Sequence, residues 1–413
     1  MRGEETSRMA RARIDSIELD APWGEAGRLR LWTARATIGD RTRAFATDAP
    51  LAPFPIAELD ARANGAGAAV IDLQAPIALA PVAVAKPWGR EVWHSGFERR
   101  GVSGVTDGRH TTPLPWALAL LGSRPRERLP LVKALEPRHE PLVGELYFEV
   151  HEEKHEVYVV TDVDLRAWPD GAGSVRFGMN PELRARFRDD ARFRADYAAA
   201  VRRYRAAREA IGSIAAGAIG EALLAEERES RRLMTAFVNR RALAPGDVVH
   251  VPPGLPHGLE HGVRVIEVQT PVFERKILSF AQRVVTQRGW DTHTAVESMR
   301  IDAPPLAQVD VLLDDGAVRI ERLARCDELD VLRVRLAPGA SWRLPSAVRH
   351  RVCFALDAGV ALGALALGRE QSCVVPAQAD RLLATNGGAD ASATFLLASC
   401  ADAPTSAVRE NDR

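Results

Sequence analysis

Short runs in which apolar and polar residues alternate make up most of the chain before residue 165 and after residue 245. Segments such as RIDSIEL, GELYFEVHEEKHEVYVV and LDVLRVRLAPGASWRL are bounded by Gly, Pro and Asp. Alternation of this kind predicts β-strands joined by turns, and many short strands are typical of a sandwich or a barrel. We therefore expect a mainly β protein.

The segment from Asn180 to about Arg241 has a different pattern. It is rich in Ala, Arg, Glu and Leu, and its apolar and aromatic residues recur near helical spacing. Asn180 is suited to cap a helix, Pro181 to its first position, and Glu182 to its positive N-terminus. The pattern predicts a helical insertion at about 180–241 between two β-rich regions.

Composition excludes several classes of function. Lys plus Arg and Asp plus Glu number 55 each, so no global field attracts nucleic acid or an anionic membrane. The N-terminus MRGEETSRMARARIDSIELD has no apolar core, and no apolar run reaches the roughly 18 residues of a spanning helix. The four cysteines lack CxxC spacing, which is typical of buried thiols in a cytosolic protein. We predict a cytoplasmic protein without a nucleic-acid or membrane partner.

The stretch FEVHEEKHEVYVV concentrates groups that can bind a metal. Two histidines and four glutamates fall between Glu149 and Glu156. Glu149 and His151 alternate along a strand, so their side chains share a face. A tight turn at Glu152–Lys154 would form a hairpin and bring Glu156 to the same interior. The alternative is a solvated, charged turn.

A second segment supplies the remaining ligand. Gly246 to His257 reads GDVVHVPPGLPH, or G-x5-P-x-G-x2-H, in which Pro and Gly make a sharp turn before His257. The two segments together resemble the two-part signature of cupin barrels, with Glu149 in place of the first histidine. The pattern predicts a metal site. Its ligands are Glu149, His151, Glu156 and His257, whereas Glu152, Glu153, His155 and His250 are surface or wall residues.

Two carboxylates and two imidazoles suit a divalent transition metal, for which we favour Zn, with Mn and Fe as alternatives. The C-terminal part contains turns like those of cupins, APGASWRLP and CVVPA, but His350 is its only histidine. It cannot repeat the site. The predicted fold is therefore two cupin barrels with a helical insertion. We assign 1–85 to an N-terminal β-rich segment, 86–300 to a metal-binding cupin domain and 301–413 to a degenerate cupin-like domain for packing or homodimerisation.

Further motifs resemble type I phosphomannose isomerases. They are KPWGREVW (Lys86–Trp93), LPLVKAL (Leu129–Leu135), EKHEVYVV (Glu153–Val160) and VRVIEVQTP. The resemblance implies two cupin barrels with a helical insertion. It aligns Lys154 with an active-site lysine, Glu149 with a metal-ligand glutamine, and His151, Glu156 and His257 with metal ligands. Glu267 falls on an acidic pocket position, and Arg283 stands in for a catalytic arginine. Only four residues separate His151 from Glu156, where the family has a long loop.

The main functional hypothesis is a sugar-phosphate aldose–ketose isomerase, acting on mannose 6-phosphate or a related sugar through a metal-stabilised enediolate. Glu267 or His261 would be the base, and Lys154 would stabilise developing negative charge. Arg275, Lys276 or Arg283 would hold the phosphate. Lys154 as a solvent-facing lysine, and Glu267 as the partner of Arg264, are the structural alternatives.

Two other functions stay open on the sequence alone. One is a non-catalytic metal cupin that binds a sugar or a small acid. The other is a cupin oxygenase that uses Fe(II). The discriminating feature is a phosphate-sized basic pocket beside the metal.

Overall fold

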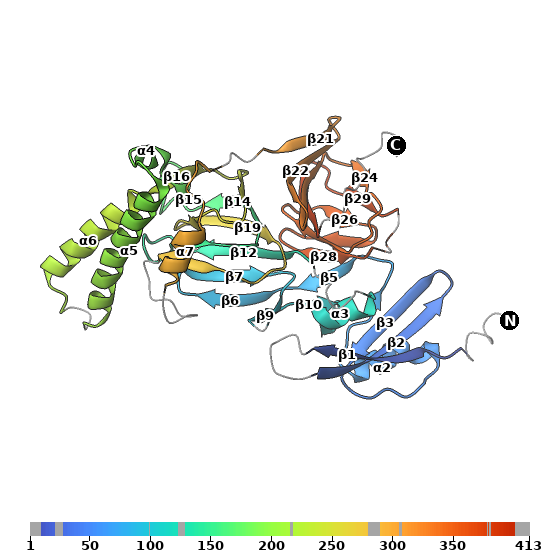
Figure 1. The fold of residues 1–413 in the computed structure, drawn as a ribbon. Helices are drawn as coiled ribbons and strands as arrows, with labels where there is room; N and C mark the ends of the chain where they lie inside the picture. The colour runs from blue at the N-terminus through green and yellow to red at the C-terminus, as the bar shows by residue number, and fades with distance from the viewer. Residues whose placement is uncertain are drawn as a thin grey trace.

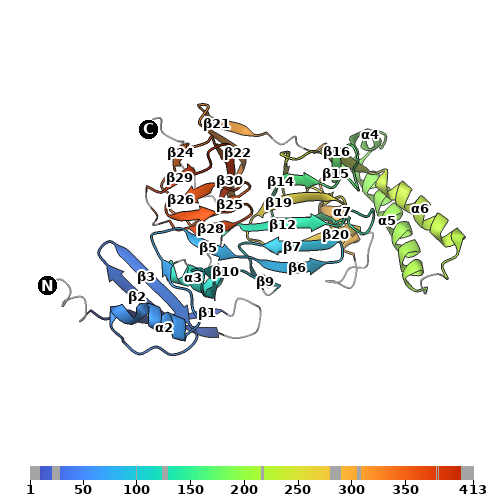
Figure 2. The same cartoon turned by 180° about the vertical axis from the view of Figure 1, so that it is seen from behind.

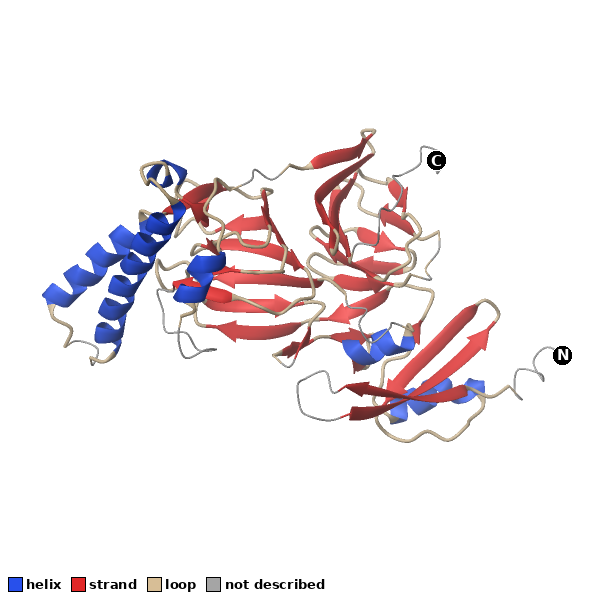
Figure 3. Cartoon of the chain, viewed as in Figure 1, coloured by secondary structure: helices blue, strands red, loops and turns tan. Residues whose placement is uncertain are grey.

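Two β units lie side by side, with helices at one end of the molecule and a small sheet at the other (Figures 1 and 3). The structure is a computed structural model that describes residues 10–20, 28–98, 100–122, 129–214, 218–279, 290–304, 308–377, 379 and 381–400. The prediction of a mainly β protein with a helical insertion is confirmed. The assignment of each unit as a cupin barrel stays a prediction.

Two facing sheets form the central unit, and a cluster of apolar side chains that includes Val175, Val251, Leu259 and Val265 fills the space between them. The first sheet has the order β17 (Val248–Val251), β14 (Glu156–Val163), β19 (Val263–Gln269), β12 (Leu131–Pro137), β7 (Gly89–Trp93) and β6 (Val82–Lys86). The second has the order β16 (Val238–Leu243), β15 (Gly173–Met179), β18 (His257–Leu259), β13 (Phe148–Val150) and β20 (Lys276–Ser279).

The helical insertion grows out of the connection between two paired strands, β15 and β16. It comprises α4 (Pro181–Arg184), α5 (Asp190–Gly212) and α6 (Glu221–Thr235). The Asn180 side chain accepts a hydrogen bond from the Leu183 N–H, as expected of a helix cap, and Pro181 opens α4. The last helix ends at Thr235, short of the predicted end near Arg241, and the chain enters β16 at Val238.

The insertion covers the outer side of the strand that carries Glu149. Phe193 and Tyr197 of α5 belong to one apolar cluster with Phe148 of β13 and Leu278 of β20. The short helix α7 (Thr292–Ser298) completes this cluster. The helices therefore brace two strands of the second sheet from behind.

Two further sheets form the C-terminal unit, which encloses its own apolar cluster around Phe395 and Leu336. The larger sheet has the order β11 (Thr111–Pro113), β10 (Gly104–Thr106), β5 (Ile77–Ala80), β28 (Ser372–Val375), β25 (Arg351–Ala355), β30 (Ala393–Ser399), β23 (Leu329–Leu336), β22 (Val318–Cys326) and β21 (Asp310–Asp314). The smaller has the order β24 (Ser341–Arg343), β29 (Leu383–Asn386), β26 (Val360–Leu362) and β27 (Leu365–Leu367).

Strand pairing departs from the domain boundaries that the sequence suggested. β5 pairs with β28, and β10 pairs with β5 and β11, so β5, β10 and β11 extend the sheet of the C-terminal unit. The separate N-terminal sheet consists of β1 (Arg13–Asp20), β2 (Arg28–Ile38), β3 (Arg41–Thr47) and β4 (Ile71–Asp72), with η1 (Ile56–Glu58) and α2 (Leu59–Gly65) beside it. Figure 2 shows this sheet apart from the larger ones. A strand pair, β8 (Phe97–Glu98) and β9 (Gly101–Val102), and the helix α3 (Leu114–Leu120) complete the order.

The two units share a continuous apolar contact. Val157 and Val268, on the outer face of the six-stranded sheet, belong to the same cluster as Val352 and Leu396 of the C-terminal unit. Arg264 adds ion pairs to Glu136 at 3.1 Å and Glu370 at 2.7 Å. In the described part of the chain, no helix combines the length and apolarity needed to cross a bilayer.

A matched pair of leucines tests the packing of the helical insertion. Leu278 is fully buried beneath the helices, whereas Leu165 is 64% exposed. We expect Leu278→Ala to lower the free energy of unfolding by about 2–5 kcal/mol, because it leaves a cavity in a packed cluster. Leu165→Ala should change it by less than about 0.5 kcal/mol. Chemical denaturation measures both, and equal effects would contradict this packing.

Candidate metal centre

The four predicted ligands come together from three separate pieces of chain. Glu149 lies on β13, His151 follows that strand, Glu156 opens β14, and His257 opens β18. Glu149 and His257 are direct partners across β13 and β18. One ligand atom from each of the four lies within 4.8 Å of the others. The four atoms could therefore surround one ion.

The predicted hairpin is wrong, although its ligands do converge. β13 belongs to the five-stranded sheet and β14 to the six-stranded sheet. The turn at Glu152–Lys154 therefore crosses between the two facing sheets. Its backbone N–H groups all donate to the Glu274 carboxylate, at 2.9–3.1 Å. These hydrogen bonds fix the turn, so that His151 and Glu156 face the same interior from two opposite sheets.

Distances within the cluster match those around a coordinated ion. His151 Nε2 lies 3.5 Å from a Glu149 oxygen and 3.2 Å from a Glu156 oxygen, and His257 Nε2 lies 3.0 Å from the other Glu156 oxygen. Ligand bonds of about 2.1 Å in a tetrahedron place ligand atoms about 3.4 Å apart. The side chains are thus already spaced as ligands.

The two imidazoles present their Nε2 atoms to the centre of the cluster. Each Nδ1 lies beside a backbone carbonyl, that of Glu274 for His151 at 2.9 Å and that of Leu255 for His257 at 3.0 Å. An Nδ1–H that donates to a carbonyl leaves the Nε2 lone pair for a metal. Both Nε2 atoms and Glu149 Oε2 are buried without a hydrogen-bond partner. Such orphaned atoms are what a metal site requires, so the residues fit a divalent ion.

Glu156 is held on both of its oxygens. Oε1 lies 2.6 Å from Lys154 Nζ, and Oε2 accepts a hydrogen bond from the Tyr158 hydroxyl at 2.7 Å. Burial alone would raise the pKa of Glu156, but Lys154 and the two histidines outweigh it and keep this pKa well below its usual value. Burial would lower the pKa of His257, but the Glu156 carboxylate raises it on balance.

Beside the ligands lies a cavity whose volume of about 50 Å³ has room for a few waters. Its lining is strongly charged. Phe273 and Arg100 lie at this lining, with the guanidinium 3.7 Å from the ring centroid. The acidic residues are Glu91, Glu98, Glu149, Glu156, Glu267 and Glu274, and the basic residues are Lys86, Arg100, Lys133, Lys154 and Arg275. Five basic side chains therefore lie next to the ligands, among six acidic ones, so the lining is mixed in charge and not basic overall.

Glu267 lines this cavity and is paired with Lys133, not with Arg264. Lys133 stands directly opposite Glu267 across β12 and β19, and its Nζ donates to Glu267 Oε2 at 3.0 Å. Arg264 is three positions away, so strand alternation directs it to the other face. Burial raises the pKa of Glu267 to about 8, and Lys133 opposes this shift only in part.

Of the four remaining predicted site residues, one lines the cavity, two lie elsewhere and one is outside the described residues. Arg275 lines the cavity, with its guanidinium 4.4 Å from the Tyr147 ring centroid and 3.9 Å from Glu149. Lys276 instead binds Glu152 at 2.5 Å and does not line the cavity. His261 stacks on Trp168, also away from the cavity lining. Arg283 lies outside the described residues.

No protein-family model and no curated protein sequence matches the chain. Solved structures do match it. The mannose 6-phosphate isomerase from Bacillus subtilis has 15% identity and a TM-score of 0.58, covering 79% of this chain and 99% of that chain. A mutant phosphomannose isomerase from Salmonella typhimurium has 14% identity and a TM-score of 0.54, with the same coverage. A zinc-bound mannose 6-phosphate isomerase has 13% identity and a TM-score of 0.54, again with that coverage. This chain has the phosphomannose isomerase fold.

Within that phosphomannose isomerase fold, several lining residues were not assigned a role from the sequence. Lys86 forms an ion pair with Glu91 at 3.1 Å, and Glu91 accepts a hydrogen bond from Trp93 at 2.5 Å. These residues and Lys133 all fall inside KPWGREVW and LPLVKAL. The sequence therefore did mark these positions as candidate site residues, because they are charged residues within strand segments that also carry apolar residues.

Metal affinity should fall as the pH falls. A proton on His257 Nε2 competes with the ion, and Glu156 raises the pKa of His257 above its ordinary 6.5. Affinity should therefore weaken through that raised pKa and below it, by about tenfold per pH unit for each proton displaced. Competition with a chelator at several pH values, with His257→Gln subtracted as background, measures this. A constant affinity between pH 8 and 5 would contradict the assignment of His257.

Proposed function

We propose that this chain is a divalent-metal-dependent isomerase that interconverts the aldose and ketose forms of a sugar phosphate, with mannose 6-phosphate as the first substrate to test. One observation carries the proposal. Two of the four candidate metal ligands, Glu149 and Glu156, line one cavity together with the buried, ion-paired carboxylate of Glu267 and five basic side chains. Similarity of fold to mannose 6-phosphate isomerases supports it.

Glu149, His151, Glu156 and His257 would hold the ion, and their donor set favours zinc over manganese or iron. The bound ion supplies Lewis-acid polarisation of the sugar oxygens at C1 and C2. Tyr158 and Lys154 keep Glu156 in one orientation through both of its oxygens. The ligand geometry is therefore set before the substrate arrives.

Glu267 is the proposed base that moves a proton between C1 and C2. A base near neutral pKa both accepts and returns a proton efficiently, and Glu267 has a pKa of about 8. Lys133 fixes the orientation of this carboxylate from the neighbouring strand. Lys154 is placed to stabilise negative charge that develops on the sugar oxygens.

Charge balance in the cavity favours an anionic substrate. Six acidic and five basic side chains line it, so with all groups ionised a divalent cation turns the net charge of the lining from negative to positive. A phosphate dianion would offset that positive charge. Arg275 and Arg100 are the proposed phosphate partners, because guanidinium groups bind phosphate oxygens in pairs.

A second candidate is a metal-binding protein that holds a sugar or a small acid without converting it. The small cavity volume of about 50 Å³ favours its small-acid form, since a sugar and a hexose phosphate both require the lining to open. Turnover separates the two candidates. An Fe(II) oxygenase is less favoured, because the second carboxylate makes a bound metal a milder Lewis acid.

Glu267→Gln tests the proposed base. We expect kcat for conversion of mannose 6-phosphate to fructose 6-phosphate to fall by about 10²–10⁴-fold, with metal content unchanged. The matched control is Glu260→Gln, because Glu260 is equally buried but pairs with Arg240 away from the cavity. A Glu267→Gln enzyme that keeps full kcat would refute this role, and metal-loaded wild-type protein without turnover would favour the second candidate.

Arg275→Met tests phosphate binding. We expect KM for mannose 6-phosphate to rise roughly 10- to 100-fold, as for loss of a charge-assisted hydrogen bond, with KM for unphosphorylated mannose much less affected. Lys276→Met is the matched control, since that neighbouring cation binds Glu152 outside the cavity. Equal effects of the two substitutions on KM would contradict the assignment of Arg275.

A further inference from the structure

A second group of metal-ligating side chains lies between the central and C-terminal units. Its first member, His155, immediately precedes Glu156, and successive residues of a strand face opposite sides. His155 therefore points away from the candidate metal centre. Its ring stacks on His250 of β17, with centroids 5.6 Å apart and planes inclined by 15°. His155 Nδ1 lies 3.4 Å from His250 Nε2.

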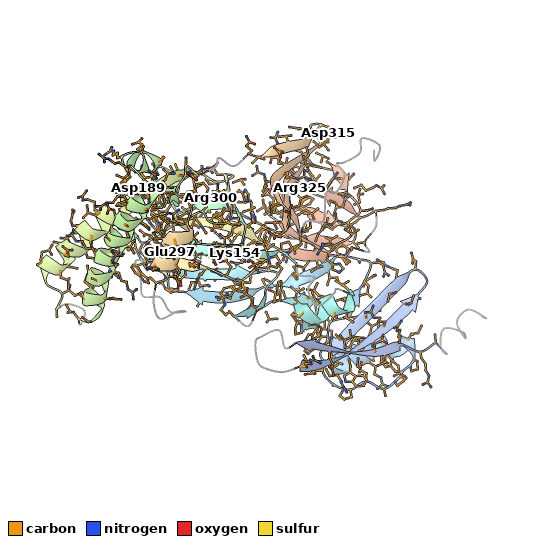
Figure 4. All side chains as sticks on the ribbon, viewed as in Figure 1. Lys154, Asp189, Glu297, Arg300, Asp315 and Arg325 are labelled. Carbon is orange, nitrogen blue, oxygen red and sulfur yellow. The ribbon has the colours of Figure 1, made fainter. Side chains whose placement is uncertain are left out.

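The other members come from the C-terminal unit. Cys326 ends β22, and Glu328 stands in the two-residue turn before β23, whose first residue Leu329 pairs with Cys326. β17 and β22 contact each other, which brings this turn to the two histidines. Figure 4 labels Arg325, the neighbour of Cys326, in the C-terminal unit, and Lys154, the neighbour of His155, in the central unit.

One ligand atom from each of His155, Cys326 and Glu328 lies within 4.8 Å of the others. A tetrahedral ion with bonds of about 2.0–2.3 Å needs ligand atoms about 3.3–3.8 Å apart. Closing from that limit to ligand spacing would take rotations of these half-buried and exposed side chains. His250 contacts the His155 member of this group, with 3.4 Å between His155 Nδ1 and His250 Nε2.

We propose that His155, Cys326 and Glu328 form a second metal site, which binds zinc or another thiophilic divalent ion across the interface of the two units. The donors decide the class of ion. Thiolate and imidazole select zinc and its transition-metal neighbours, whereas magnesium and calcium prefer oxygen ligands. This site shares no ligand with the candidate metal centre, and it does not depend on the proposed isomerase activity.

The local electrostatics suit a cation. Burial lowers the pKa of His250 to about 4, with His155 adding to the shift, so the His250 ring adds no positive charge beside His155 at neutral pH. Burial raises the pKa of the Cys326 thiol, and the nearby carboxylates add to this shift. A bound cation would lower the pKa of the Cys326 thiol, because it stabilises the thiolate directly.

Such an ion would be structural. It would tie the β22–β23 turn to the residue next to Glu156, and so would fix the C-terminal unit against the sheet that carries the candidate catalytic cavity. Metal that binds only the folded arrangement adds its binding free energy to the stability of that arrangement. The C-terminal unit, which carries no part of the first site, thereby gains a specific function.

Cobalt(II) titration of the full-length, reduced protein tests this site. A thiolate ligand produces a sulfur-to-cobalt charge-transfer band in the near ultraviolet, and the candidate metal centre contains no cysteine. We expect two cobalt ions per wild-type chain and the charge-transfer band. Cys326→Ser should lose the band and one ion, whereas Cys400→Ser, at the other half-buried thiol, should keep both.

His257→Gln separates the two sites, since it should lose one ion and keep the band. Two results would overturn the proposal. One is a wild-type protein that binds cobalt without the charge-transfer band. The other is a band that persists in Cys326→Ser. Loss of the first site alone would leave the band intact, so the failure of the isomerase proposal and the failure of this one are distinguishable.

Discussion

The burial of the Glu156 carboxylate is the constraint on which the rest of the site depends. A carboxylate that is only 2% exposed is costly unless cations and donors surround it. Its two oxygens meet Lys154 and His151 on one side, and His257 and Tyr158 on the other. His151 and Lys154 come from the connection between β13 and β14, Tyr158 from β14 itself and His257 from β18. The full set of partners therefore forms only when these strands keep their register.

The two facing sheets and the turn between them bring the partners of Glu156 together. The turn at Glu152–Lys154 carries the chain from one sheet to the other, so ligands enter the interior from both walls. Glu274 binds the backbone of the turn and lends its own carbonyl to His151. The helical insertion packs behind Phe148, and the C-terminal unit covers the outer face of the opposite sheet. Both walls of the cavity are thereby supported from outside.

Local spacing, together with the resemblance to the two-part cupin signature, was enough to predict which four residues converge; that they bind a metal stays a prediction. Glu149, His151, Glu156 and His257 do converge. Asn180 also caps its helix as expected. What failed depended on long-range pairing. The hairpin prediction assumed that β13 and β14 are partners, although each pairs with strands more than about 80 residues away in the sequence.

The same limit explains the misplaced side chains. His261 follows His257 by four residues, but the strand carries it out of reach of the cavity lining, to Trp168. The partner of Glu267 could not be found from sequence either, since Lys133 is 134 residues away and meets it only through the pairing of β12 with β19. His155 and His250 were interpreted as surface or wall residues, because the local sequence does not show that Cys326 and Glu328 of another unit lie beside His155.

The most direct test of the central claim is anomalous X-ray diffraction from crystals of zinc-loaded protein, recorded on both sides of the zinc absorption edge. A metal held by the buried cluster predicts an anomalous peak within bonding distance of the Nε2 atoms of His151 and His257 and of the carboxylates of Glu149 and Glu156. A map without density among those four residues, at zinc concentrations that saturate the protein, would contradict the claim that the cluster exists to hold an ion.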